Sequence, residues 1–371
     1  MRKQFSLEGF TFDDVLLIPQ FSSVFTRMDV NTESYLCFEE SSVGMECIKL
    51  KSPIISANMD SITESAMAIK MALLGGVGVI HRYLSTKEQL NEVFKVKEVC
   101  KEEIESYPDA TLNSKGELIV GAAVGIKNED YYRVDQLVEG GVDFIVVDVA
   151  HGHFDGVGMM VDLTKKAYPH IPLVAGNVAT SDGAKYLFDK GADVVKVGIG
   201  SGSICSTRII TGSGVPQLTA IMNCSEVARN YGKTIIADGG IRTPGDFSKA
   251  IAIGANCVML GSVLSGTKET PGEVKNIDGR EYKTYRGMAS REASMNRPGY
   301  DKKEKTTPEG IDTNVPYKGP VDNVIDYMMG GLRSGMSYSG CRTVADFMIQ
   351  SKFMRITDSG KKESHPHILD T

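Results

Sequence analysis

The sequence predicts a single (β/α)8 barrel, because short apolar segments and amphipathic segments alternate eight times along the chain. The apolar segments are almost continuously hydrophobic, as expected for parallel strands that are buried on both faces. Gly-Ala or Gly-Val pairs precede several of them, which is typical of a helix end that leads into a strand. Polar residues gather directly after these segments, where a barrel of this class carries its active site.

The expected elements can be read in order from residue 51 onward. The eight expected strands are Pro53–Ala57, Val77–Ile80, Leu118–Ala123, Phe144–Val147, Leu173–Ala175, Val194–Val197, Ile235–Ala237 and Cys257–Leu260. The expected helices are Ser61–Leu74, Thr86–Glu105, Tyr131–Glu139, Asp155–Ala167, Ser181–Lys190, Leu218–Tyr231, Asp246–Ile253 and Val321–Met329. A doubly wound sheet is the alternative, but it would need a glycine-rich phosphate loop after the first strand. The segment Ser56–Asp60 contains no glycine, so the barrel is favoured.

The stretch from Gly198 to Gly214 follows the sixth strand and has glycine at positions 198, 200 and 202. Glycine lets the backbone turn sharply and approach a ligand closely. Cys205 lies in this loop, among free backbone N–H groups, so it is a candidate nucleophile. The alternative is a small buried hydrophobic residue, as most intracellular cysteines are.

Composition restricts the function classes. The chain has 371 residues and a net charge of -6, which argues against a nucleic-acid surface. It lacks an N-terminal signal region and any run of 18 apolar residues, so we expect a cytoplasmic protein that does not contact a membrane. Its seven cysteines form no CxxC pair, and we expect free thiols.

The segment from about residue 268 to 320, called the flap below, fits no barrel unit. It is charged, contains Gly and Pro, and lacks a hydrophobic period, so we expect a mobile lid or a disordered insert. We therefore expect one catalytic domain over residues 1–371 that includes this long flap after the eighth strand and ends in a tail at 361–371.

Five strings then indicate a family. They are the Cys205 loop, Ile236-Ala-Asp-Gly-Gly-Ile-Arg242, Met259-Leu-Gly-Ser262, Tyr285-Arg-Gly-Met288 and Tyr317-Lys-Gly-Pro320. In this order they resemble the family of IMP dehydrogenases and GMP reductases over nearly the whole chain. The resemblance implies a barrel, a homotetramer, a purine mononucleotide (GMP or IMP) as substrate and a nicotinamide dinucleotide at the carboxyl end of the strands.

The resemblance also implies roles for individual residues. The 5′-phosphate would be held by Ser203, Gly240, Gly261, Ser262 and Tyr285, through hydroxyls and backbone N–H groups. Asp238 would accept both ribose hydroxyls, although Asp-Gly-Gly can also be a tight turn. The remaining substrate contacts would come from Ser56, Met59, Gly287 and Met288. The cofactor would contact Asp148, Asn177, Ala150 and Arg82, and the last could pair with a 2′-phosphate.

A monovalent cation such as K+ is also implied by the resemblance. Backbone carbonyls of Gly200, Gly202 and Cys205 would bind it, and a neighbouring subunit's Glu363, Ser364 and His365 would complete its site. His151 and His153 look like metal ligands, but no carboxylate or cysteine set accompanies them, which favours structural or rim roles.

Two features separate the reactions of the family. Dehydrogenases carry an Arg-Tyr pair on the flap, whereas here Arg297 is followed by Pro298 and the nearest tyrosine is Tyr300. Most dehydrogenases insert paired CBS modules after the second barrel unit, whereas only about residues 84–116 separate the second and third strands here. The short span from Gly287 to Glu309 also resembles the reductase flap, whereas the N-terminal half and the Glu-Ser-His-Pro-His tail look more like a dehydrogenase.

We therefore expect a GMP reductase that uses NADPH, in which Cys205 attacks purine C2 and Thr207 with Glu309 relays the proton that leaves with ammonia. Thr207 could instead be a turn hydroxyl, and Glu309 a solvated flap charge. The alternatives are an IMP dehydrogenase that lacks CBS modules and uses NAD, and a protein that only binds purine nucleotides. A flavin-dependent barrel has no support beyond a generic phosphate loop.

Overall fold

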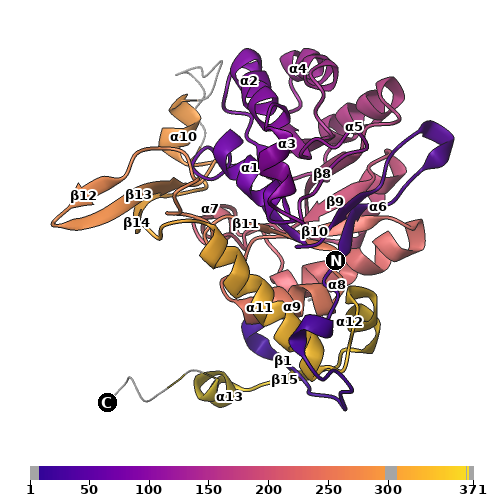
Figure 1. The fold of residues 1–371 in the computed structure, drawn as a ribbon, viewed down its shortest axis with the longest axis vertical. Coiled ribbons are helices and arrows are strands. Elements are labelled where there is room, and N and C mark those ends of the chain that lie inside the picture. The colour runs from indigo at the N-terminus through magenta and orange to yellow at the C-terminus, as the bar shows by residue number, and fades with distance from the viewer. Residues whose placement is uncertain (1–7, 297–306, 365, 367–371) are drawn as a thin grey trace, which may run out of the picture.

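The computed structural model describes residues 8–296, 307–364 and 366. Eight parallel strands close into a barrel in the order β10-β11-β4-β5-β6-β7-β8-β9 (Figure 1). The strands are β4 (Ile54–Ser56), β5 (Val77–Ile80), β6 (Val120–Val124), β7 (Phe144–Asp148), β8 (Leu173–Val178), β9 (Val194–Val197), β10 (Thr234–Asp238) and β11 (Cys257–Leu260). Each expected strand is present, and the predicted TIM-barrel fold is confirmed.

Helices follow the strands and, apart from the short α7 in the Cys205 loop after β9, cover the outside of the barrel. They are α1 (Ser65–Leu73), α2 (Thr86–Lys97), α3 (Lys101–Glu105), α4 (Asn128–Glu139), α5 (Asp155–Ala167), α6 (Ser181–Asp189), α7 (Thr207–Thr211), α8 (Gln217–Tyr231), α9 (Pro244–Ala252) and α11 (Asp322–Tyr338). The expected helix Thr86–Glu105 is divided into α2 and α3, and between β5 and β6 the chain forms only these two helices and turns.

Helix α11 continues beyond the predicted end at Met329, through Gly330 and Gly331. A Cβ on Gly331 would lie 2.0 Å from Cβ of Pro244, the first residue of α9. The glycine therefore allows the two helices to pack closely and does not end α11. Gly331 thus serves helix packing, whereas a Cβ on Gly330 would meet open space.

A hairpin covers the amino ends of the strands. It consists of β2 (Ser34–Cys37) and β3 (Ile48–Leu50), and the Thr234 hydroxyl at the start of β10 donates to the Leu36 carbonyl. The other peripheral elements are β1 (Val15–Leu17), which pairs with β15 (Phe353–Arg355), the helices α12 (Val344–Gln350) and α13 (Asp358–Glu363), and the 3-10 turns Phe12–Asp14, Arg27–Asp29 and Ser41–Val43. The amino end of the barrel is thus closed.

The flap contains an antiparallel sheet that extends away from the barrel in Figure 1. Its elements are β12 (Lys275–Ile277), β13 (Arg280–Arg286), β14 (Asp312–Pro316) and the helix α10 (Arg291–Asn296). The sequence did not predict these strands because a lysine occupies one of the two buried positions of β13. Lys283 is 3% exposed and donates to the carbonyls of Thr267 and Lys268 at 3.3 and 3.2 Å. The described part of the flap therefore forms regular secondary structure, whereas a disordered insert was one of the two expectations.

No helix in the described ranges combines the length and the hydropathy that crossing a bilayer requires.

Candidate active site

A cavity of about 290 Å³ opens at the carboxyl ends of the barrel strands. Eighteen of the residues predicted for the site line it. They are Met59, Arg82, Asp148, Ala150, Asn177, Gly200, Gly202, Ser203, Cys205, Thr207, Asp238, Gly240, Gly261, Ser262, Tyr285, Gly287, Met288 and Glu309. The fold thus brings together residues that are spread over 250 positions of the chain.

The three predicted catalytic side chains form one hydrogen-bonded series. The Cys205 thiol donates to Thr207 Oγ1 across 3.1 Å, and the Thr207 hydroxyl donates to Glu309 Oε2 across 2.8 Å. Thr207 is the first residue of α7, whereas Glu309 belongs to the flap. All three side chains are half-buried. This arrangement can move a proton between the sulfur and the carboxylate through the hydroxyl.

The flap backbone fixes Glu309 beside the cysteine loop. The N–H of Ser206 donates to the Glu309 carbonyl at 2.9 Å, and the N–H of Ile311 donates to the Ile204 carbonyl at 3.1 Å. On the other side, the N–H of Glu309 donates to the Ala289 carbonyl at 3.0 Å. Backbone hydrogen bonds thus join the cysteine loop, the segment around Glu309 and the segment around Ala289. These bonds hold the Glu309 carboxylate near the Cys205 thiol.

The predicted phosphate residues form a polar corner of the same cavity. Ser203 Oγ and Tyr285 Oη lie 3.3 Å apart, and burial raises the pKa of the Tyr285 hydroxyl, which keeps it protonated and able to donate. A Cβ on Gly261 would lie 3.3 Å from both Met59 Sδ and Tyr285 Oη. Gly240 has a φ of 80°, a conformation that favours glycine. Hydroxyls and unobstructed backbone N–H groups suit an anionic oxygen ligand.

Four adjacent strands contribute one polar side chain each to the centre of the cavity. Lys196, in β9, is 2% exposed, and its Nζ donates to Asp148 Oδ1 and Asp238 Oδ2, both at 2.9 Å, and to Asn177 Oδ1. Asn177 Nδ2 in turn donates to Asp238 Oδ2 at 2.8 Å. Asp148 ends β7, Asn177 lies in β8, and Asp238 ends β10.

Charge in this cluster is balanced locally. Burial alone would raise the pKa of the Asp148 carboxyl, but the neighbouring Lys196 and Arg82 cations hold it below its usual range. Burial alone would lower the pKa of Lys196, but the two carboxylates raise it. Sequence reasoning missed Lys196. The available signal was a charged residue in the middle of an otherwise apolar strand, because such a residue is buried only with partners.

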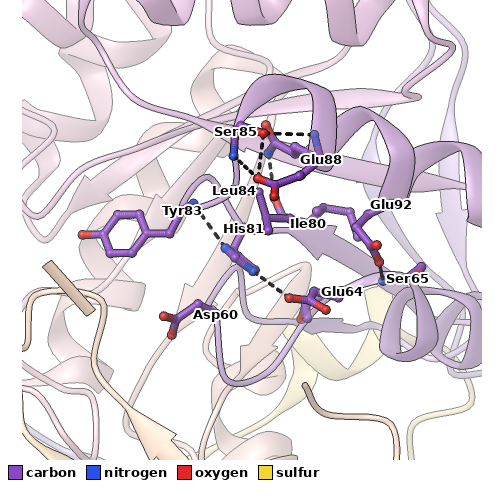
Figure 2. Close-up of polar contacts among 12 residues, drawn as sticks. Asp60, Glu64, Ser65, Ile80, His81, Tyr83, Leu84, Ser85, Glu88 and Glu92 are labelled. Carbon is purple, nitrogen blue, oxygen red and sulfur yellow. Dashed lines mark hydrogen bonds and ion pairs between the residues drawn. The ribbon is translucent and has the colours of Figure 1, made fainter. Parts of the chain in front are cut away.

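Arg82 and Tyr83, in the loop after β5, line the cavity. Figure 2 shows Tyr83 next to His81 in this loop. The backbone N–H of Tyr83 donates to His81 Nδ1 at 3.2 Å, and His81 Nε2 lies 3.4 Å from Glu64 Oε1. Through this hydrogen bond His81 holds the loop that carries Arg82 and Tyr83. The Nε of Arg82 is buried without a hydrogen-bond partner, which fits a ligand that brings acceptor oxygens, as a nicotinamide dinucleotide does.

Met288 is held from two sides. The Tyr83 hydroxyl donates to the Met288 carbonyl at 2.7 Å, and the N–H of Asp60 approaches Met288 Sδ at 3.4 Å. Asp60 itself forms an ion pair of 2.7 Å with Arg286, two residues before Met288. These contacts join the segment of the flap from Arg286 to Met288 to the loops after β4 and β5. Sequence reasoning noted Asp60 only as a polar strand end and did not single out Tyr83.

Several predicted site residues lie elsewhere. Ser56 was predicted to contact the substrate, but its side chain is fully buried and accepts from the Thr63 hydroxyl at 2.9 Å, because at this position of β4 the strand faces away from the cavity. Glu363 and Ser364 lie at and just after the end of α13, far from α7 in Figure 1, so only those of another chain could reach the Cys205 loop. His365, Arg297 and Tyr300 lie outside the described residues.

The two candidate histidines form no metal centre in the structure. His151 and His153 have ring centroids 6.4 Å apart, and His153 packs on Tyr186 at 5.1 Å. Among the residues that the structure describes, no group of three His, Cys, Asp or Glu side chains is placed to hold a metal ion.

Comparison with known proteins gives concordant matches. A family model described as the IMP dehydrogenase / GMP reductase domain matches residues 9–367. An inosine-5′-monophosphate dehydrogenase of Cryptosporidium parvum is 42% identical over 98% of this chain and 96% of its own length. One from Aquifex aeolicus is 39% identical over 97% and 95%. The crystal structure of a GMP reductase from Trypanosoma brucei, a cysteine-to-alanine variant in complex with guanosine 5′-monophosphate, matches with a TM-score of 0.90 and 33% identity over 98% of both chains.

Proposed function

The chain belongs to the family of IMP dehydrogenases and GMP reductases, and from this premise we propose that it acts as a GMP reductase. It would convert GMP to IMP and ammonia with NADPH, through a covalent bond between Cys205 and purine C2. The observation that carries the proposal is the series Cys205–Thr207–Glu309, with hydrogen bonds of 3.1 and 2.8 Å. A reductive deamination needs an acid for the departing amine, and this series supplies one at the nucleophile.

In the first step the Cys205 sulfur forms a bond to C2 of GMP. The thiol proton moves through the Thr207 hydroxyl to Glu309, so the sulfur attacks as a thiolate. The same proton then returns along this path to the 2-amino nitrogen. The C2–N bond breaks, its electron pair goes to nitrogen, and ammonia leaves.

The second step replaces the lost amine by hydrogen. The nicotinamide cofactor, when bound, supplies the hydride that C2 receives. Asp148 would hold the ribose next to the nicotinamide, and Arg82 would face the cofactor's acceptor oxygens. The C2–S bond then breaks, Cys205 leaves as a thiolate, and IMP remains. Asp238 and the Ser203–Tyr285 corner would hold the nucleotide through both steps.

An IMP dehydrogenase without CBS modules is the second candidate, because the curated relatives named above are dehydrogenases at 39 and 42% identity. Glu309 is a possible base for water in that reaction. The missing Arg-Tyr pair argues against it, since Arg297 is followed by proline in the sequence. A catalytically inactive nucleotide-binding protein would not need the thiol relay.

One assay separates these candidates. Absorbance at the nicotinamide band is followed in two mixtures, GMP with NADPH and IMP with NAD and potassium. Consumption of NADPH with formation of IMP and ammonia supports the reductase. Reduced cofactor and XMP in the second mixture would establish the dehydrogenase, and no change in either, with nucleotide still bound, would favour the inactive protein.

Three accompanying assignments stay proposals. We propose NADPH rather than NADH because Arg82 offers an unpartnered Nε on the cofactor wall. A potassium ion at the carbonyls of Gly200, Gly202 and Cys205 would need Glu363 and Ser364 from a neighbouring chain of a homotetramer. Omission of potassium and measurement of the solution mass test these two assignments.

A further inference from the structure

The buried Lys196 lies between two carboxylates that the proposed function gives to different ligands. Its Nζ has three protons and three acceptors, namely Asp148, Asp238 and Asn177. The ammonium is therefore fully satisfied by the protein and has no donor left for substrate or cofactor. Its effect on ligands must pass through the groups that it holds.

Those groups are oriented for binding. Both hydrogen bonds that Asp238 accepts from Lys196 and Asn177 go to Oδ2, which leaves Oδ1 of this cavity-lining carboxylate for a ligand hydroxyl. Asp148 accepts from Lys196 through Oδ1 and also lines the cavity. One ammonium thus links the side-chain positions of both carboxylates and of the amide between them.

The positive charge of Lys196 is needed to keep Asp148 and Asp238 both charged and close together. Two carboxylates that share a buried site without a cation repel each other, and one of them would become protonated or turn away. With Lys196 in place both stay charged and near each other. A ligand that orders one carboxylate then also orders the lysine and, through it, the other carboxylate, so the second ligand binds a site that is already ordered.

We propose that Lys196 is a positioning residue that couples binding of the purine nucleotide at Asp238 to binding of the nicotinamide cofactor at Asp148. The proposal rests on the proposed function for the identity of the two ligands. It adds a role for a residue that contacts neither of them.

The coupling is measured by binding in a Cys205→Ala background, so that no turnover consumes the ligands. The dissociation constant of NADPH is determined with and without saturating GMP, by cofactor fluorescence and by calorimetry. We expect GMP to tighten NADPH binding at least about fivefold. In Lys196→Met, whose side chain keeps an unbranched apolar stem but loses the ammonium, this factor should fall to about one.

A matched control removes a lysine of helix α5 that forms an ion pair beside the opposite end of the same strand. Lys165 pairs with Asp193, the residue before β9, at 2.7 Å. Lys165→Met should lower the denaturant midpoint but retain the coupling factor. If Lys196→Met retained it as well, or if GMP had no effect on NADPH in the parent, the proposal would be wrong. Should Lys196→Met not fold, Lys196→Gln keeps an amide donor and should show a reduced factor, and an unreduced one contradicts the proposal.

Kinetics with Cys205 intact provides a second readout. Lys196→Met should raise KM for both ligands at least about tenfold while kcat falls less, because both carboxylates lose their orientation and the Cys205–Thr207–Glu309 series is untouched. A fall in kcat with unchanged KM values would overturn the proposal. The binding test does not depend on turnover and is repeated with IMP and NAD, the ligands of the second candidate, so a failure of the reductase assignment in the absorbance assay is distinguishable from a failure of the coupling.

Discussion

Both ends of the barrel contain a buried cluster of lysine and aspartate, and the cluster at the carboxyl end faces the cavity described above. At the amino end, Asp193 is 1% exposed and accepts from Lys165 at 2.7 Å, Lys233 at 2.8 Å and the N–H of Leu173 at 2.9 Å. At the carboxyl end the charges are reversed, with one lysine, Lys196, between two carboxylates. The first cluster is closed by the β2–β3 region, from which Glu40 also contacts Lys233.

The difference shows how the same residue types serve structure at one end and, in the proposed function, binding at the other. Asp193 has each oxygen occupied by protein donors, so it has nothing to offer a ligand. Asp238 accepts the hydrogen bonds from Lys196 and Asn177 both through Oδ2, and the residue lines the cavity. Complete satisfaction of a buried charge indicates a structural role, and partial satisfaction beside a cavity indicates a site.

The largest effect on activity is expected for substitution of Cys205, whose thiol lies at the carboxyl end of the barrel. Cys205→Ala should reduce turnover at least 10³-fold, since the covalent step disappears, while GMP binding changes less than about threefold. Absorbance and calorimetry measure the two quantities. Cys224→Ala is the matched control, because Cys224 is fully buried against the Thr180 carbonyl and should leave turnover unchanged. Activity near the wild-type level in Cys205→Ala would contradict the covalent scheme.

The second largest effect on activity is expected when the proton relay through Thr207 and Glu309 is interrupted. Glu309→Gln keeps the shape of the side chain but cannot hold the thiol proton, so kcat should fall about 10²–10³-fold with little change in KM. Thr207→Val should have an effect of similar size. Single-turnover release of ammonia is the measurement, and a loss confined to KM would place Glu309 in binding instead of catalysis.

At the amino end the effect should be on stability alone. Asp193→Asn leaves two lysines without their carboxylate and should destabilise the fold by about 3 kcal/mol. The midpoint of urea unfolding should fall, whereas kcat/KM of the remaining folded enzyme should stay within about twofold. A large change in KM would mean that the Asp193 cluster affects ligand binding at the other end of β9, which would contradict a purely structural role.

The smallest effect is expected at Ser56. Because its hydroxyl only accepts from Thr63 inside the core, Ser56→Ala should cost about 1 kcal/mol of stability and leave the KM for the nucleotide unchanged. Steady-state kinetics with a urea titration test this. A rise of KM above about threefold would restore Ser56 as a substrate contact.

The barrel and most of its site residues could be predicted from the sequence. Each strand is an apolar run whose length and flanking glycines are local properties, and polar strand ends gather at one rim in any parallel barrel. The cysteine loop, Asp148 and Asp238 were found in this way. The roles of these residues came from the family resemblance, because a spacing alone does not distinguish a ribose ligand from a turn.

Only the tertiary structure decided which side chains meet. The partners of Lys196 lie on three other strands, and Glu309 reaches Thr207 across 102 residues of sequence. The Ser56 side chain is buried against Thr63, and Lys283 of the flap donates to the carbonyls of Thr267 and Lys268. Such contacts depend on register and closure between distant segments, which have no local signature in the chain.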